Sequence, residues 1–159
     1  MPTTRKRGTA YTGRGYGTLR YMLQQNAKRR IEVSLREGYY CEAITIIESF
    51  MSERLESRLS FLTGTNIGFC TLGKLVTELR KFEVEPELLG LLDEINEWRS
   101  KRNLAVHELV KVEELKELAG WNQRMKQVAN TANDGYSLLQ CIYHSVRRLN
   151  PKHPDDIFA

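Results

Sequence analysis

The sequence predicts an all-α protein, folded as an up-and-down bundle of about five helices. Three observations favour this class: apolar residues recur every three to four positions, no segment alternates like a half-buried strand, and glycine or proline stands at several interruptions of the helical pattern. A chain of 159 residues can bury one core without disulfides or a metal. We expect a helical domain over residues 18–149, a flexible tail at 1–17 and a short tail at 150–159.

The first two expected helices span residues 18–36 and 39–63. Gly38 and Gly64 follow them, as glycine commonly does at a helix C-terminus. The second helix carries the broader apolar stripe, so we expect it to be the central helix of the core. Apolar residues at four-residue intervals mark the inward side of the first helix (Leu19, Leu23, Ala27, Ile31 and Leu35).

Three further helices are expected in the second half of the chain. A short one at 72–82 has Thr71 as a suitable N-cap, and a longer one at 86–110 begins with proline. The last spans 112–149, with a kink near 133–135, where the sequence reads Asn-Asp-Gly. We expect both tryptophans to lie in the core (Trp98 and Trp121).

The apolar stripe of the fourth expected helix contains an arginine. Its members stand three or four residues apart (Leu89, Leu92, Ile95, Trp98, Arg102, Ala105 and Leu109). A lone arginine there is costly unless its charge meets an acid or an anion, so Arg102 is either half of a structural ion pair or a site residue. We expect it to pair with Glu48 of the second helix.

Arg102 also begins the most informative stretch of the chain, which reads arginine, asparagine, three further residues and histidine. Asn103 and His107 are four residues apart, so a helix presents both on one face, and the long side chain of Arg102 can reach them. The spacing alone is weak support, because a similar arginine–histidine spacing occurs at 147–153. Prolines break that second segment, and we discount it.

Basic charge is concentrated at the N-terminus. Residues 1–20 hold five basic residues and no acidic one, which leaves −1 for the rest of a chain whose net charge is +4. The tail at 1–17 has too few aliphatic residues to pack. A solubilising terminus explains this composition as well as a nucleic-acid arm does. In the second case four basic side chains would contact phosphates (Arg5, Lys6, Arg7 and Arg14).

Cysteine usage and hydropathy indicate a cytoplasmic protein. The three cysteines show no metal-ligand spacing and leave an odd thiol if two pair, which is typical of a reducing compartment. No apolar run approaches the roughly 20 residues that span a bilayer, and no signal core follows the basic N-terminus. We therefore expect no membrane contact. Neither a metal motif nor a glycine-rich phosphate loop indicates a metal or a cofactor.

With these features the chain resembles the HEPN superfamily of small helical bundles, which includes many ribonuclease toxins and defence proteins. The resemblance covers about residues 18–149. It rests on the arginine, polar residue and histidine of a late helix (Arg102, Asn103 and His107), on an earlier apolar helix that carries Glu48, and on a long final helix. It implies metal-independent cleavage of RNA in a homodimer whose two motifs meet across a shared groove. The basic tail is not part of the family's common pattern.

The motif residues suit that chemistry. Cleavage without a metal uses the ribose 2′-hydroxyl as nucleophile, a base, an acid and positive charge near the phosphorane. His107 would carry the proton, since histidine can gain and lose one near neutral pH. Arg102 would hold the phosphate with two hydrogen bonds, and Asn103 would orient the phosphate or the histidine. DNA would be spared, and the products would be a 2′,3′-cyclic phosphate and a 5′-hydroxyl.

Three functions remain open on the sequence. The first is the endoribonuclease, acting as a toxin or phage-defence effector and restrained by a cognate antitoxin or regulatory protein. The second is a non-catalytic HEPN-like module that binds RNA or a nucleotide. The third is a structural or partner-binding bundle. In this third case His107 is an ordinary surface histidine, Asn103 caps a restarted helix, and Arg102 is a structural ion-pair partner whose loss costs roughly 3–5 kcal/mol.

Overall fold

The computed structural model describes residues 16–68, 70–111 and 120–150, and over these ranges the protein is all-helical, as predicted. Five α-helices and one π-helical turn follow one another: α1 (Tyr16–Glu37), α2 (Tyr40–Thr63), α3 (Leu72–Leu79), α4 (Pro86–Arg102), η1 (Asn103–His107) and α5 (Trp121–Leu149). None of the described helices combines the length and apolar character that crossing a bilayer requires.

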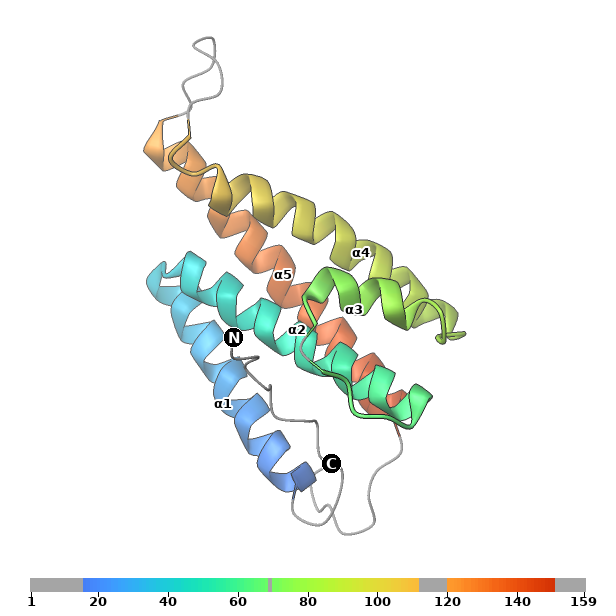
Figure 1. The fold of residues 1–159 in the computed structure, drawn as a ribbon. Helices are drawn as coiled ribbons and strands as arrows, with labels where there is room; N and C mark the ends of the chain where they lie inside the picture. The colour runs from blue at the N-terminus through green and yellow to red at the C-terminus, as the bar shows by residue number, and fades with distance from the viewer. Residues whose placement is uncertain (1–15, 69, 112–119, 151–159) are drawn as a thin grey trace, which may run out of the picture.

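The four long helices run alternately in opposite directions (Figure 1). α1 packs mainly on α2, α4 packs on α5, and the contact between α2 and α5 joins the two pairs. The short helix α3 lies in the connection between α2 and α4 and contacts both. The arrangement is therefore an up-and-down bundle with one short connecting helix.

Several predicted boundaries are confirmed. Gly38 and Gly64 adopt left-handed conformations, with φ of 83° and 66°, directly after α1 and α2. Thr71 caps α3 by accepting the backbone N–H of Lys74 at 3.3 Å. The core is built from fully buried side chains, the largest of which include Ile47, Met51, Leu55, Leu92, Ile95, Leu139 and Ile142.

The close approach of α4 to α5 depends on a glycine. The Trp98 side chain is buried, as predicted, and its Nε1–H donates to the Thr131 carbonyl at 2.8 Å. A Cβ atom at Gly135 would lie 2.5 Å from Trp98 Nε1, so any larger residue would displace the indole. α5 continues as one helix through residues 133–135, where the sequence predicts a kink.

Three predicted core positions are wrong. Leu19 is 52% exposed and Leu23 59% exposed, because a four-residue repeat drifts on a helix of 3.6 residues per turn. From Leu19 to Ile31 the drift amounts to about 120°, and it is Ile31 that faces the core. Trp121 is 59% exposed, since α5 begins at this residue and its first turn lies at the end of the bundle.

The limits of the predicted tails also shift. α1 begins at Tyr16, two residues before the predicted start of the helical domain. At the other end, the Asn150 side chain donates to Ser57 Oγ at 3.2 Å and is part of the folded domain. The remainder of both predicted tails and the predicted helical turns at 112–119 lie outside the described residues.

Candidate active site

The helix predicted over residues 86–110 changes its winding within the motif. α4 ends at Arg102, and Asn103–His107 form the π-helical turn η1. In an α-helix, residues five apart point about 140° away from each other. A π-helical turn closes i→i+5 hydrogen bonds and accommodates about one extra residue, so residues five apart point in directions about as similar as residues four apart in an α-helix. The wider turn therefore brings Arg102 and His107 to the same side.

The guanidinium of Arg102 joins two side chains from distant parts of the sequence. Its NH2 donates to Glu48 Oε1 at 2.7 Å, which is the ion pair expected from the sequence. Its NH1 lies 3.2 Å from His107 Nε2. The side chains of Arg102 and Glu48 are 16% and 31% exposed, so the pair is shielded from water without being removed from it.

The chemical nature of the contact between Arg102 and His107 depends on the tautomer of the histidine. A guanidinium has only donors, so this contact is a hydrogen bond only when His107 Nε2 is unprotonated and accepts. The neutral imidazole then carries its proton on Nδ1. With this tautomer the lone pair of Nε2 is occupied by Arg102.

Asn103 stands beside this pair and is not bonded to it. Its side chain is exposed and makes no hydrogen bond within the described part of the chain. Its backbone is helical, with φ −59° and ψ −46°, so the alternative in which Asn103 caps a restarted helix is wrong. The ring of His107 is also exposed, and the site is open enough for a polymeric ligand.

Arg124 of α5 holds the chain that leaves the π-turn, and sequence reasoning missed it. Its NH1 donates to the carbonyl oxygens of Glu108, Leu109 and Lys111 at 3.0, 2.8 and 2.8 Å. The last carbonyls of a helix have no partner in their own helix, and a cation is favourable beside them. The sequence holds no signal for it, because the helix predicted over residues 112–149 places Arg124 in its interior, whereas α5 begins at Trp121.

The most deeply buried ion pair lies elsewhere. Arg58 donates to both carboxylate oxygens of Glu83 at 2.7 and 3.0 Å, and their side chains are 6% and 0% exposed. Burial opposes ionisation of Glu83. The hydrogen bonds from Arg58 and from the backbone N–H groups of Glu85 and Val84 outweigh burial and hold the pKa of Glu83 below its ordinary value. This pair joins α2 to the loop between α3 and α4, and nothing in its geometry suggests chemistry.

The other predicted site features are only partly visible. The basic residues of the tail lie outside the described residues (Arg5, Lys6, Arg7 and Arg14). Among the described residues, no three His, Cys, Asp or Glu side chains gather where they could hold a metal ion. Comparison with protein-family models, curated proteins and solved structures finds no match for this chain.

Proposed function

We propose that the protein is a metal-independent endoribonuclease of HEPN type, with Arg102 and His107 as its catalytic residues and Asn103 beside them. The observation that carries the proposal is the Arg102 guanidinium, held by Glu48 and placed 3.2 Å from the basic nitrogen of an exposed histidine. A cation and a proton acceptor within hydrogen-bonding reach of each other are the two groups that 2′-hydroxyl attack on a phosphodiester needs.

The resting contact between the two residues suggests how RNA would start the reaction. A phosphate that accepts hydrogen bonds from Arg102 competes with His107 for the guanidinium. His107 Nε2 is then free to take the proton of the 2′-hydroxyl as O2′ attacks phosphorus. The O2′–P bond forms, the P–O5′ bond breaks, and the leaving O5′ takes a proton from an acid. In a homodimer the partner's His107 can supply that proton.

Glu48 acts in this scheme as a positioning residue. Its hydrogen bond to NH2 fixes one edge of the guanidinium and leaves NH1, which faces His107, for a phosphate. Losing this bond would let the flexible arginine side chain take other directions. We therefore expect replacement of Glu48 to lower the rate of cleavage without changing the reaction or its products.

Exposed apolar side chains near the motif support the homodimer. Leu104 lies within the π-turn and is 68% exposed, Val110 follows it and is 81% exposed, and Trp121 of α5 is 59% exposed. Apolar groups gathered at one end of a molecule are common where another protein surface docks. A second copy seated there would bring two motifs together.

The deciding experiment incubates the full chain with end-labelled RNA in EDTA. We expect cleavage that leaves cyclic-phosphate ends, spares a DNA of the same sequence, and is lost in His107→Ala and Arg102→Ala. Lys101→Ala, an exposed cation next to the motif, is the matched control and should cut normally. Cleavage that survives His107→Ala would refute the assignment, while RNA binding without cutting would favour the non-catalytic module.

A role as a toxin or phage-defence effector adds one expectation. Induced expression of the wild-type chain should arrest growth of the host cell, and His107→Ala should not. Co-expression of a cognate antitoxin or regulatory protein would relieve the arrest. Normal growth with an RNA-cutting wild type would argue against a toxin.

A further inference from the structure

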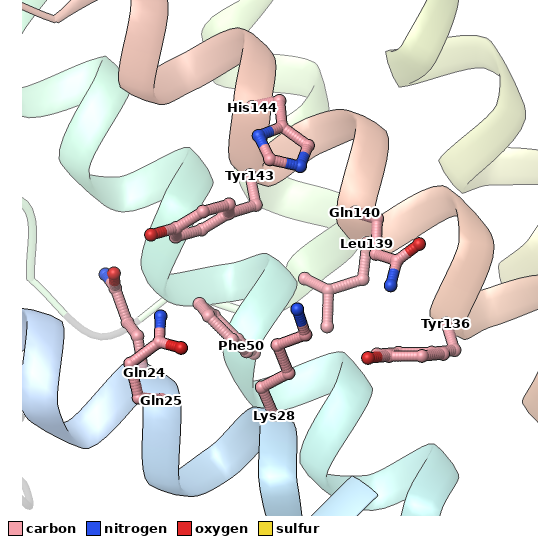
Figure 2. A pocket seen from close by; sticks show the side chains of 9 residues that line it. All are labelled: Gln24, Gln25, Lys28, Phe50, Tyr136, Leu139, Gln140, Tyr143 and His144. Carbon is pink, nitrogen blue, oxygen red and sulfur yellow. The ribbon is translucent and has the colours of Figure 1, made fainter. Parts of the chain in front are cut away.

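A second candidate site lies between α1, α2 and α5 (Figure 2). It is a cavity of about 50 Å³, open at a rim of exposed side chains. Phe50 of α2 lines it, whereas Glu48 belongs to the site described above. Residues two apart on a helix point about 160° away from each other, so the cavity and the motif lie on opposite sides of α2.

Aromatic rings form the walls of the cavity. Tyr143 of α5 meets Phe50 with ring centroids 5.9 Å apart and meets His144 at 5.4 Å, both in edge-to-face geometry. These contacts fix the Tyr143 ring, which Figure 2 shows pointing from α5 toward α1. Rings held in this way are suited to stacking against another flat, unsaturated group.

Amides and a cation form the rim. Gln25 and Lys28 reach from α1 toward the rings (Figure 2), and neither side chain is hydrogen-bonded to another described residue. Gln140 extends from α5 on the other side. A carboxamide offers both donors and an acceptor, which matches the alternating donors and acceptors along the edge of a nucleobase.

The charges that face the cavity favour an anion. Lys28 lines it directly, and its side chain is exposed and forms no ion pair with another described residue. Arg54, whose guanidinium lies 6.0 Å from the centroid of the Tyr143 ring, is already paired with Glu53 and adds no free charge. The nearby carboxylate of Glu32 is engaged, because it accepts the Tyr136 hydroxyl at 2.5 Å. Burial and this hydrogen bond raise the pKa of Tyr136 to about 12, so the hydroxyl remains protonated and adds no negative charge. A quaternary ammonium ligand, which aromatic rings alone would attract, would be repelled by Lys28.

We propose that this cavity binds a nucleotide, with its base against Tyr143, the amides of Gln25 and Gln140 at the edge of the base, and Lys28 at the phosphate. A volume of about 50 Å³ holds only a few water molecules, so the edge of the base enters and the sugar and phosphate stay at the mouth. The ligand is either a free nucleotide or an unpaired residue of RNA. The site does not depend on RNA cleavage by the motif across α2.

The test uses the full chain and two kinds of probe. Calorimetric titration measures binding of the four common nucleoside 5′-monophosphates, with inorganic phosphate as a comparison, and fluorescence anisotropy measures binding of a labelled 12-nucleotide single-stranded RNA. We expect saturable binding of a nucleotide or of the RNA. Tyr143→Leu and Lys28→Ala should each weaken it about tenfold. Arg29→Ala, an exposed cation next to Lys28, should leave the affinity unchanged.

The two probes separate the sources of the ligand. Binding of monophosphates identifies a free-nucleotide site, and binding of the RNA alone identifies a subsite for a strand. The proposal is overturned if neither probe binds saturably, if inorganic phosphate binds as well as the nucleotides, or if Lys28→Ala leaves the affinity unchanged. Because Lys28 is exposed, its variant should fold normally, and a thermal melt of Tyr143→Leu shows whether that variant is folded.

Discussion

Two arginine–carboxylate pairs that differ in burial allow a test of whether Arg102 is a catalytic or a structural residue. The pair of Arg58 and Glu83 is 6% and 0% exposed, whereas that of Arg102 and Glu48 is 16% and 31% exposed. Replacing each arginine by alanine leaves one carboxylate without its partner. The burial of that unpaired carboxylate determines how much folding free energy is lost.

The expected losses of stability differ several-fold. Orphaning the fully buried Glu83 should cost about 3–5 kcal/mol, as is typical of a broken buried pair. When Arg102 is removed, water can solvate the partly exposed Glu48. The loss of stability in Arg102→Ala should therefore lie near the value of a surface ion pair, about 1 kcal/mol. For a chain of this size each kcal/mol corresponds to about 2–4 °C in Tm. We therefore expect Arg58→Ala to melt about 6–20 °C lower and Arg102→Ala about 2–4 °C lower than the wild type.

Thermal melts followed by circular dichroism measure the stability of each variant. The RNA-cleavage assay, run at a temperature where all variants are folded, measures their activity. Arg102→Ala should retain its fold and lose cleavage. Arg58→Ala should lose stability and, while folded, keep cleaving. This crossed pattern is the signature of a catalytic Arg102 and a structural Arg58.

A large loss of stability in Arg102→Ala would refute this reasoning. If its Tm falls as far as that of Arg58→Ala, Arg102 is a structural ion-pair partner, as in the third function left open by the sequence. If its fold and its cleavage are both unchanged, the motif has no function in this reaction.

Four further predictions follow from the fold and the site. Gly135→Ala forces a Cβ to within 2.5 Å of Trp98 Nε1 and should destabilise the bundle by about 1–3 kcal/mol in urea unfolding, with a changed near-ultraviolet signal from the indole. The pKa of Glu83 is lowered from 4.5, so its contribution to the free energy of unfolding should be complete above pH 4.5 and decline below it, and Glu83→Gln should flatten that decline in urea titrations. Arg124→Ala removes the hydrogen bonds to the carbonyls after the π-turn and should lower kcat with little change in KM. An unchanged kcat would mean that the π-turn keeps its geometry without Arg124. Deleting Leu104 shortens the π-turn by one residue and removes an apolar side chain from the expected dimer surface, so the folded variant should lose cleavage, whereas retained cleavage would mean that neither the π geometry nor Leu104 is required.

The sequence predicted those parts of the fold that are set by local chemistry. Glycines in the left-handed conformation end α1 and α2, and Thr71 begins α3, because each of these signals acts within a few residues. The pair of Arg102 and Glu48 was also predictable, since a lone arginine on an apolar stripe needs an acid on a neighbouring helix.

Features that depend on the packing of distant segments were not predictable. Arg124 contacts carbonyl groups, which every residue carries, so no particular partner residue in the sequence indicates its role. Arg58 and Glu83 meet only because α2 and the loop before α4 come together in three dimensions. The exposure of Leu19 follows from slow drift of its repeat around the helix, which a four-residue spacing conceals over short stretches.

The π-turn shows why a motif can be recognised from its spacing while its geometry is wrongly derived. The spacing predicts Asn103 and His107 on one face of an α-helix, with Arg102 reaching them through its long, flexible side chain. An α-helix would in fact turn Arg102 and His107 about 140° apart. The extra residue of the wider turn reduces that offset to about 40°, and Arg102 contacts His107 at 3.2 Å while still bonded to Glu48. π-helical turns are rare and occur often at functional sites. Arg124 of α5 bonds the carbonyls directly after this turn, so the packing of α5 holds the segment that leaves the motif.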